Sequence, residues 1–238
     1  MQGGCTYLQR YNHNMLLLEN LISLFAPFSC LGCGVETNRL LCQSCVDATP
    51  VVPSRCYRCR ATTRDFAVCG RCSRHTPLRS VWVARHYEGL PKELLHSAKY
   101  ERARSGLRDI ATDMTSLFEG TDDEMLFVPV PTATSRVRQR GYDQAVVLAQ
   151  EIATNSRSRT VEALVRLGQA HQVGAGRKER LEHLQGAFRV IHAAEIRGKR
   201  CVLVDDVITT GATIETAARM LKKAGAKQVD AVVYCQAG

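Results

Sequence analysis

Two neighbouring aspartates and a threonine-rich turn make up the segment of the chain with the most specific chemistry. Residues 202–213 read V-L-V-D-D-V-I-T-T-G-A-T, an apolar run that delivers Asp205 and Asp206 to a short turn and then to a helical pattern over residues 212–224. The N-terminus of a helix offers unpaired N–H donors and partial positive charge, so this turn is expected to bind a phosphate. The carboxylates can accept hydrogen bonds from sugar hydroxyls. The segment therefore predicts a site for a phosphorylated ribose.

Other phosphate-binding motifs fit this segment less well. A P-loop would need Gly-Lys-Ser/Thr after the turn, and a dinucleotide fingerprint would need three spaced glycines. Neither is present in residues 202–213. The remaining alternative is an ordinary strand–turn–helix with an aspartate at the helix cap. That alternative explains one carboxylate, whereas two carboxylates beside a hydroxyl-rich loop favour ribose phosphate.

A second set of reactive side chains lies near the N-terminus. Eight cysteines form four Cys-x-x-Cys pairs: Cys30/Cys33, Cys42/Cys45, Cys56/Cys59 and Cys69/Cys72. Four thiolates suit one tetrahedral Zn²⁺, so the pairs predict two structural zinc sites. We favour ordered pairing, with the first two pairs in one site and the last two in the other, over a crossed arrangement. A redox pair or an iron–sulfur cluster remains as an alternative that four evenly spaced pairs disfavour.

The elements that must position these groups follow from an alternation of strand and helix patterns. Strands are expected over residues 81–87, 125–130, 161–167 and 187–191, and helices over 94–100, 107–118 and 144–153. A loop is expected over residues 136–141. Alternating strands and helices predict an α/β fold with a largely parallel sheet covered on both faces. The motif strand is expected at the centre of the sheet, with ligands at the carboxyl ends of the strands. Cys201 and Cys235 lie in apolar strand patterns and are expected to be core residues.

Length and charge bound the remaining possibilities. The chain has 238 residues, enough for one α/β domain and a small module, and a formal net charge of +9. Such a charge suits a diphosphate and nucleic acid equally. Residues 15–28 are too short to span a bilayer and predict an amphipathic helix. Because no secretory leader pattern is present, we expect a cytoplasmic protein without membrane insertion.

The expected organisation has three parts. Residues 1–29 form an N-terminal extension with the amphipathic helix, residues 30–76 a double four-cysteine zinc-finger module, and residues 77–238 the α/β domain. So small a cysteine-rich module has little core of its own, and metal binding is expected to supply most of its folding free energy.

Several motifs together resemble one family. Residues 202–213 resemble the diphosphoribose-binding motif of type I phosphoribosyltransferases. Residues 127–145, F-V-P-V-P-T-A-T-S-R-V-R-Q-R-G-Y-D-Q-A, and residues 96–100, H-S-A-K-Y, resemble signatures of the ComF family. ComF proteins join a cysteine-rich finger to a phosphoribosyltransferase-like domain and are associated with DNA uptake during competence. The domain is also similar to the synthase half of amidophosphoribosyltransferases, and Asp143 stands where those relatives commonly have Asn.

The resemblance implies roles for individual residues. Asp205 and Asp206 would hold the ribose hydroxyls as the catalytic pair of phosphoribosyl transfer from phosphoribosyl diphosphate, bound with Mg²⁺, to an unidentified nitrogen acceptor. The 5-phosphate would lie on the loop made by Thr209, Thr210, Gly211, Ala212 and Thr213. Arg136, Arg138 and Arg140 would contact the leaving diphosphate, and the segment with Arg177 and Arg180 would close over the substrate as a lid. Lys99 is a further candidate for substrate binding, with a plain helix-end charge as its alternative. The alternative for each arginine is a solvated basic loop.

A second function remains open at this point. The same site could hold diphosphoribose or a nucleotide without turnover, while the basic surface holds single-stranded DNA. The scarcity of aromatic residues beside basic ones counts against tight strand binding. In a third arrangement the finger would dock a competence helicase or another competence protein.

Overall fold

The computed structural model describes residues 28–100, 103–118, 124–167 and 187–238. The chain divides into two compact units between Ala48 and Thr49. The boundaries expected at residues 29/30 and 76/77 stay predictions. The expected amphipathic helix lies outside the described residues, except for its last position, Phe28, which is in a strand.

The described part of the first unit is small. Strands β1 (Phe28–Ser29) and β2 (Glu36–Thr37) pair antiparallel, and helix α2 (Gln43–Ala48) follows. Leu40 and Leu41, which lie in the chain between β2 and α2, are both buried. Two buried leucines make a very small apolar core, which agrees with a module that depends on its metal.

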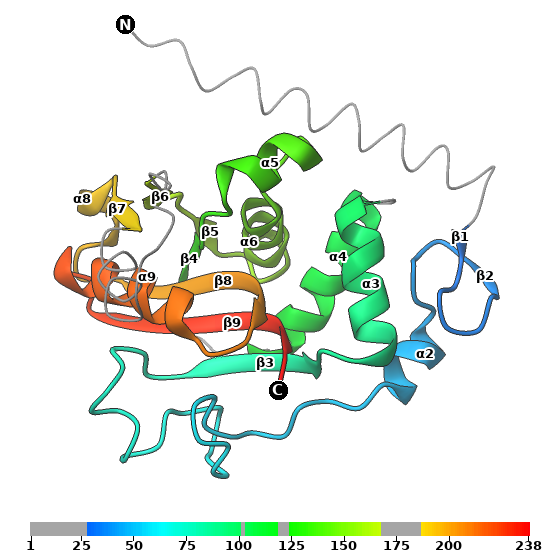
Figure 1. The fold of residues 1–238 in the computed structure, drawn as a ribbon, viewed down its shortest axis with the longest axis horizontal. Helices are drawn as coiled ribbons and strands as arrows, with labels where there is room; N and C mark the ends of the chain where they lie inside the picture. Colours follow the sequence, from blue (N-terminus) through cyan, green and yellow to red (C-terminus); the bar gives the residue numbers. More distant parts are fainter. Residues whose placement is uncertain (1–27, 101–102, 119–123, 168–186) are drawn as a thin grey trace, which may run out of the picture. The chain divides into compact units, whose positions relative to one another are not determined.

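A five-stranded parallel sheet forms the centre of the second unit. Its order is β3-β9-β8-β4-β5, and every pairing within it is parallel (Figure 1). The strands are β3 (Val81–His86), β4 (Leu126–Pro129), β5 (Arg159–Thr160), β8 (Arg200–Ile208) and β9 (Gln228–Gln236). The motif strand, β8, is the central one. The predicted fold class and the central position of this strand are confirmed.

Helices cover the two faces of the sheet because successive strand residues point to opposite sides. On one face lie α3 (Gly89–Tyr100), α4 (Ala103–Thr115), the short helix η1 (Ser116–Phe118) and α6 (Gln144–Asn155). There the ring of Phe118 lies between those of Trp82 and Phe127, at centroid distances of 5.9 and 5.7 Å.

Helix α9 (Ala212–Lys223) packs against β8 and β9 on the other face. The core of this face contains the alternate strand residues, such as Leu203 and Val233, and Ala217 of α9. The same core also takes in Val52, Tyr57 and Leu78, which precede the sheet in the chain. The segment that carries the second group of cysteines is therefore built into the α9 face.

The structure differs from the sequence expectation after β4. Residues expected as a loop form helix α5 (Thr134–Arg140), which ends at Gly141 with φ 79° and a hydrogen bond of 2.8 Å from its N–H to the carbonyl of Val137. None of the side chains of α5 is buried, so its sequence lacks the apolar periodicity that identifies a helix. The expectation of a loop was wrong for this reason.

The remaining elements lie beside the sheet. Strands β6 (Leu164–Arg166) and β7 (Phe188–Val190) pair antiparallel, and helix α8 (Ala193–Ile196) follows β7. Cys201 and Cys235 are buried in β8 and β9, as predicted. Among the helices of the described residues, none is both long and apolar enough to cross a membrane.

Candidate functional site

Strand β8 carries the two aspartates at the carboxyl edge of the sheet. Because they are consecutive, Asp205 belongs to the α9 face and Asp206 to the face covered by α3 and α4. Lys99, near the end of α3, lies with its Nζ 2.6 Å from Oδ2 of Asp206. The main-chain N–H of Asp206 donates to Oδ1 of Asp205 at 2.8 Å. The structure thus joins the predicted carboxylate pair and the predicted lysine in one cluster.

The two carboxyl groups titrate differently. Burial, together with the neighbouring charge of Asp206, raises the pKa of Asp205 well above its usual range. Burial also acts to raise the pKa of Asp206, but the charge and hydrogen bond of Lys99 outweigh it and hold this pKa below its usual range. One group of the pair favours its proton while the other stays ionised. Such separation of adjacent carboxyl groups is typical of functional sites.

The loop after β8 has the form expected of a phosphate cradle. Thr209 and Thr210 are exposed, and Gly211 is the N-cap residue of α9, with φ 80°. The hydroxyl of Thr210 lies 3.4 Å from the N–H of Ala212 and can accept from it. Thr213, half-buried, stands in the first turn of the helix. The loop therefore presents hydroxyls and a helix N-terminus at the same edge of the sheet as the carboxylates.

Tyr57 touches this loop from the cysteine-rich segment, a contact that the sequence analysis missed. A Cβ atom placed on Gly211 would lie 2.7 Å from Cε2 of the Tyr57 ring. The Tyr57 hydroxyl donates to Oε1 of Glu215 at 2.6 Å and lies 3.0 Å from the hydroxyl oxygen of Thr76. No spacing within the sequence signals a contact between residues this far apart.

The P-V-P turn after β4 lies beside the central strand. The N–H of Val130 donates to the carbonyl of Val204 at 2.9 Å. The carboxylate of Asp143 accepts from the N–H and the hydroxyl of Thr132, at 3.0 and 2.8 Å, and from the N–H of Ala145 at 3.0 Å. Asp143 thus caps α6 and holds the turn. All three contacts need only acceptor oxygens, so aspartate serves this role in place of the common asparagine.

The predicted diphosphate arginines are distributed over α5 and a segment beyond it. Arg136 and Arg138 are exposed on α5, whereas half-buried Arg140 donates to Oε1 of Gln144 at 2.9 Å. Helix α5 follows β4, the neighbour of β8, so these side chains start from the carboxyl edge of the sheet. Arg177 and Arg180 lie outside the described residues.

The eight paired cysteines form two clusters. The first cluster is Cys30, Cys33, Cys42 and Cys45, and the second cluster is Cys56, Cys59, Cys69 and Cys72; within each, the sulfur atoms lie within 4.8 Å of one another. This is the ordered pairing, and the crossed alternative is excluded. The donor set is that of a structural zinc site.

The thiols of each cluster also fit a metal electrostatically. Burial acts to raise the pKa of Cys30, but backbone N–H groups, led by that of Cys42, lower it to about 6. Hydrogen bonding to the other three thiols raises the pKa of Cys45 to about 12. In the second cluster burial acts to raise the pKa of Cys56, but backbone N–H groups lower it to about 7, whereas burial and hydrogen bonds to the neighbouring thiols raise the pKa of Cys72 to about 12. Four adjacent thiols cannot all ionise without a cation, and a divalent metal would supply the missing charge.

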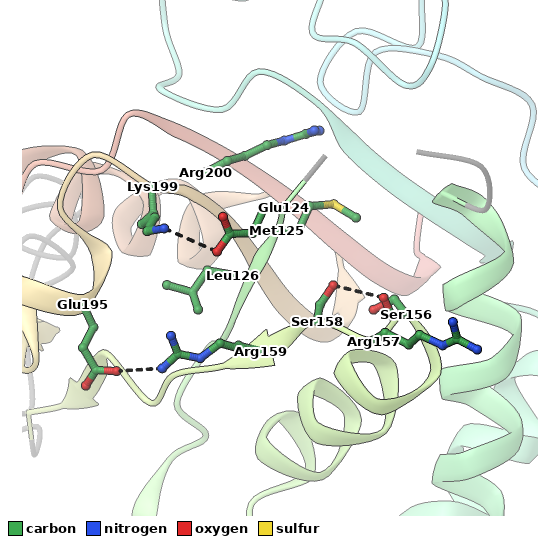
Figure 2. Close-up of a pocket in the computed structure, with 10 residues that line it drawn as sticks. All are labelled: Glu124, Met125, Leu126, Ser156, Arg157, Ser158, Arg159, Glu195, Lys199 and Arg200. Carbon is green, nitrogen blue, oxygen red and sulfur yellow. Dashed lines mark hydrogen bonds and ion pairs between the residues drawn. The ribbon is translucent and has the colours of Figure 1, made fainter. Parts of the chain in front are cut away.

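A polar pocket of about 380 Å³ lies elsewhere, at the amino ends of β4, β5 and β8 (Figure 2). Two of its cations are engaged in ion pairs with carboxylates that also line it: Lys199 lies 3.3 Å from Glu124, and Arg159 lies 3.7 Å from Glu195. None of the residues expected to bind ribose phosphate lines this pocket. It is separate from the cluster at the carboxyl edge, where ligands of parallel sheets bind.

Comparisons with known proteins find one domain family and several similar proteins. Residues 127–238 match the family model of the phosphoribosyl transferase domain. The chain is 28% identical to "Competence protein ComFC" of Bacillus subtilis (strain 168), over 71% of this chain and 78% of that protein. It is 29% identical to "DNA utilization protein YhgH" of Escherichia coli (strain K12), over 82% of this chain and 90% of that protein. The glutamine phosphoribosylpyrophosphate amidotransferase of B. subtilis shares 18% identity, with a TM-score of 0.39 over 53% of this chain and 26% of that chain.

The class of protein follows from the parallel sheet, the carboxylate pair on its central strand and the domain match. The chain has a phosphoribosyltransferase-like fold, with residues 127–238 matched by the domain model and four-cysteine clusters before them. More particularly, its predicted resemblance to the ComF family is confirmed by relatives that match over most of its length.

Proposed function

We propose that the chain binds phosphoribosyl diphosphate with Mg²⁺ and transfers its phosphoribosyl group to a nitrogen acceptor, in a process linked to DNA uptake. The observation that carries the proposal is the cluster of Asp205, Asp206 and Lys99 beside the hydroxyl-rich N-terminus of α9. Carboxylates recognise ribose hydroxyls and the helix N-terminus recognises the 5-phosphate. The names of the relatives, a competence protein and a DNA utilization protein, support the link to DNA.

The reaction asks for positioning and electrostatic stabilisation rather than for a covalent intermediate. The bond between C1 of the ribose and the diphosphate breaks, and the diphosphate leaves with the electron pair. The nitrogen lone pair of the acceptor forms the new bond to C1, and the nitrogen then loses its proton. Ionised Asp206 and the adjacent Asp205 hold the sugar and lie near the positive charge that develops on it.

Basic residues at the same edge suit the other end of the substrate. The exposed guanidinium groups of Arg136 and Arg138 on α5 have the forked donors that match phosphate oxygens. Mg²⁺ prefers the oxygen ligands that a diphosphate and carboxylates supply, and when bound it would neutralise the diphosphate. Lys99 keeps Asp206 ionised at neutral pH, so that this carboxylate can accept hydrogen bonds from ribose.

Calorimetric titration of phosphoribosyl diphosphate with Mg²⁺ tests the proposal. We expect saturable binding to the wild type and about a thirtyfold or greater loss in Asp205→Ala/Asp206→Ala, because one charge-assisted contact at roughly 1.5–3 kcal/mol and one neutral contact at roughly 0.5–1.5 kcal/mol are removed. Arg157→Ala, in the separate polar pocket, is the control and should bind like the wild type. Absence of binding to the folded wild-type protein would refute the proposal.

A second candidate is a binding protein without turnover, which holds a nucleotide or single-stranded DNA. The net charge of +9 and the DNA-related names of the relatives favour it. Its signature is DNA affinity that falls steeply with added salt. Binding of that kind, together with a site that holds phosphoribosyl diphosphate but releases no diphosphate with any acceptor, would select this candidate.

A further inference from the structure

The second cluster reaches the ribose-phosphate loop through the two residues between its first pair of cysteines. Tyr57 and Arg58 stand between Cys56 and Cys59, and Tyr57 is only 4% exposed. In a Cys-x-x-Cys turn these intervening residues move with the thiolates that flank them. The position of Tyr57 therefore depends directly on the geometry of the metal cluster.

The ring of Tyr57 sets how closely the loop can approach the cluster. It lies against Gly211 so tightly that even a methyl group there would be at 2.7 Å. Gly211 has φ 80° and immediately precedes the first helical residue of α9. A displacement of the ring would remove the surface on which this left-handed residue rests, and the start of the helix would lose its support.

Polar contacts join the same turn to the first turns of α9. Glu215 is buried, and its Oε1 accepts from the Tyr57 hydroxyl at 2.6 Å and lies 3.5 Å from Nη1 of Arg58. The side chain of Gln236, at the end of β9, donates to the carbonyl of Tyr57 at 3.2 Å. Without these partners the buried carboxylate would keep only Arg219 of its own helix, whose Nη2 lies 3.1 Å from Oε2, so loss of the Tyr57 hydrogen bond would be costly and the contacts tie the position of α9 to the turn.

The turn between Cys56 and Ala61 contains an unfavourable backbone conformation. It is closed by two backbone hydrogen bonds of 2.9 Å, from Arg60 to the carbonyl of Cys56 and from Cys56 to the carbonyl of Ala61. Arg60 adopts φ 63°, a left-handed conformation that is unfavourable for a residue with a side chain. Metal binding by the four thiolates would add stabilisation that offsets this unfavourable conformation.

We propose that the metal in the second cluster controls the ribose-phosphate loop, with Tyr57 as the positioning residue that links them. Loaded with metal, the cluster holds Tyr57 against Gly211 and Glu215 and keeps the N-terminus of α9 in place for the 5-phosphate. Loss of the metal releases the loop and weakens ligand binding. The effect on ligand affinity rests on the proposed function, whereas the effect on the loop does not.

Hydrogen exchange over residues 205–216 of the full-length, ligand-free protein tests the link directly. The matched variants are Cys59→Ser and Cys33→Ser, since each removes an exposed cysteine that ends the first pair of its cluster. Each is expected to lose half of the bound zinc. Only Cys59→Ser is expected to speed exchange in residues 205–216, by about tenfold, and to weaken binding of phosphoribosyl diphosphate by a similar factor. Equal exchange in the two variants would overturn the proposal.

A third variant, Tyr57→Leu, keeps every thiol and decides the matter if Cys59→Ser fails to fold. It should retain the wild-type zinc content and still speed exchange in residues 205–216 at least fivefold. Wild-type exchange in this variant would show that Tyr57 does not position the loop. If the wild type binds no phosphoribosyl diphosphate, the proposed function fails, yet the exchange comparison still decides whether the cluster controls the loop.

Discussion

The two four-cysteine clusters share their local geometry. In each, the carbonyl of the first cysteine accepts a 2.9 Å hydrogen bond from the residue four positions on, which is Gly34 for Cys30 and Arg60 for Cys56. That residue is left-handed in both, with φ of 76° and 63°. Spacing, sulfur grouping and turn are thus alike, and the two clusters are expected to bind the same metal.

Their surroundings differ. Between the first two cysteines of the first cluster stand Leu31, half-buried, and Gly32, exposed, in the compact unit that ends at Ala48. The corresponding place in the second cluster holds Tyr57, which belongs to the core of the second unit, residues 49–238, called the sheet unit below. Ligand spacing therefore specifies a metal site, but the residues between the ligands decide what the metal stabilises.

Removal of the metal is expected to give the largest difference between the two clusters, measured as the stability of the sheet unit. Apparent binding free energies of structural zinc are roughly 10–16 kcal/mol, so a chelator should lower the thermal midpoint of the sheet unit strongly. We expect this decrease in the wild type and in Cys33→Ser, which keeps the second cluster intact. In Cys59→Ser the chelator should change the midpoint of the sheet unit little, since that metal is already absent.

Unfolding followed by circular dichroism, with and without chelator, measures this difference. Far-ultraviolet signal reports the helices and strands of the sheet unit, which contains most of the described secondary structure. The comparison between the clusters is broken if Cys33→Ser proves to be the insensitive variant.

Two glycine substitutions, one in the first cluster and one beside the second, are expected to differ in their cost to stability by a smaller amount. Gly34 and Gly211 are both left-handed, with φ of 76° and 80°. Around Gly34 an added Cβ would meet nothing within 4 Å, whereas at Gly211 it would meet the Tyr57 ring. Gly34→Ala should therefore cost about 1–2 kcal/mol from the backbone alone. Gly211→Ala adds the clash and should cost roughly 2–5 kcal/mol.

The two glycine variants are also expected to differ in their affinity for the ligand. Gly211→Ala should weaken phosphoribosyl diphosphate binding by about tenfold or more, because the cap of the phosphate loop is distorted. Gly34→Ala should bind like the wild type. Equal losses of affinity would mean that the first cluster also supports the ribose-phosphate site.

Substitution of Lys99 is expected to give the smallest loss of stability. It also serves as a control, because Lys99 lies on the face of the sheet opposite the second cluster. Lys99→Met removes the ammonium that lowers the pKa of Asp206, while the burial that raises it remains. At neutral pH the variant should be less stable by about 1–2 kcal/mol, because a half-buried carboxylate loses its partner. Zinc content and its link to residues 205–216 should be unchanged.

The pH dependence of this loss has a definite sign. A folded-state pKa below the unfolded value means that Asp206 contributes stability above the ordinary Asp pKa of about 3.9 and loses it as pH falls through the lowered folded value. The stability difference between the wild type and Lys99→Met should therefore shrink as pH falls below that range. Urea unfolding from pH 7 to pH 3 measures it, and a difference that grows toward acid would exclude the ion pair as its source.

Much of the site could be predicted from the sequence. The aspartate pair, the threonine loop and the four cysteine pairs each lie within a few residues, so their types and spacing report local geometry directly. Apolar strand patterns located β3, β4 and β8 and placed β8 at the centre of the sheet. The strands expected over residues 161–167 and 187–191 instead form the separate antiparallel pair of β6 and β7, and the two-residue edge strand β5 was not expected. Helix α5 escaped prediction because its side chains are not buried, and a helix without an apolar face leaves no periodicity to detect.

The sequence by itself determined which residues can bind a metal and which can bind a ribose phosphate. Only the tertiary structure decided how these sites are connected. Lys99 meets Asp206, and Tyr57 meets Glu215, across more than a hundred intervening residues. Such contacts depend on which faces of the sheet the helices and the cysteine-rich segment cover. That arrangement is set by packing of the whole core, because no short stretch of sequence encodes what a distant segment will bring beside it.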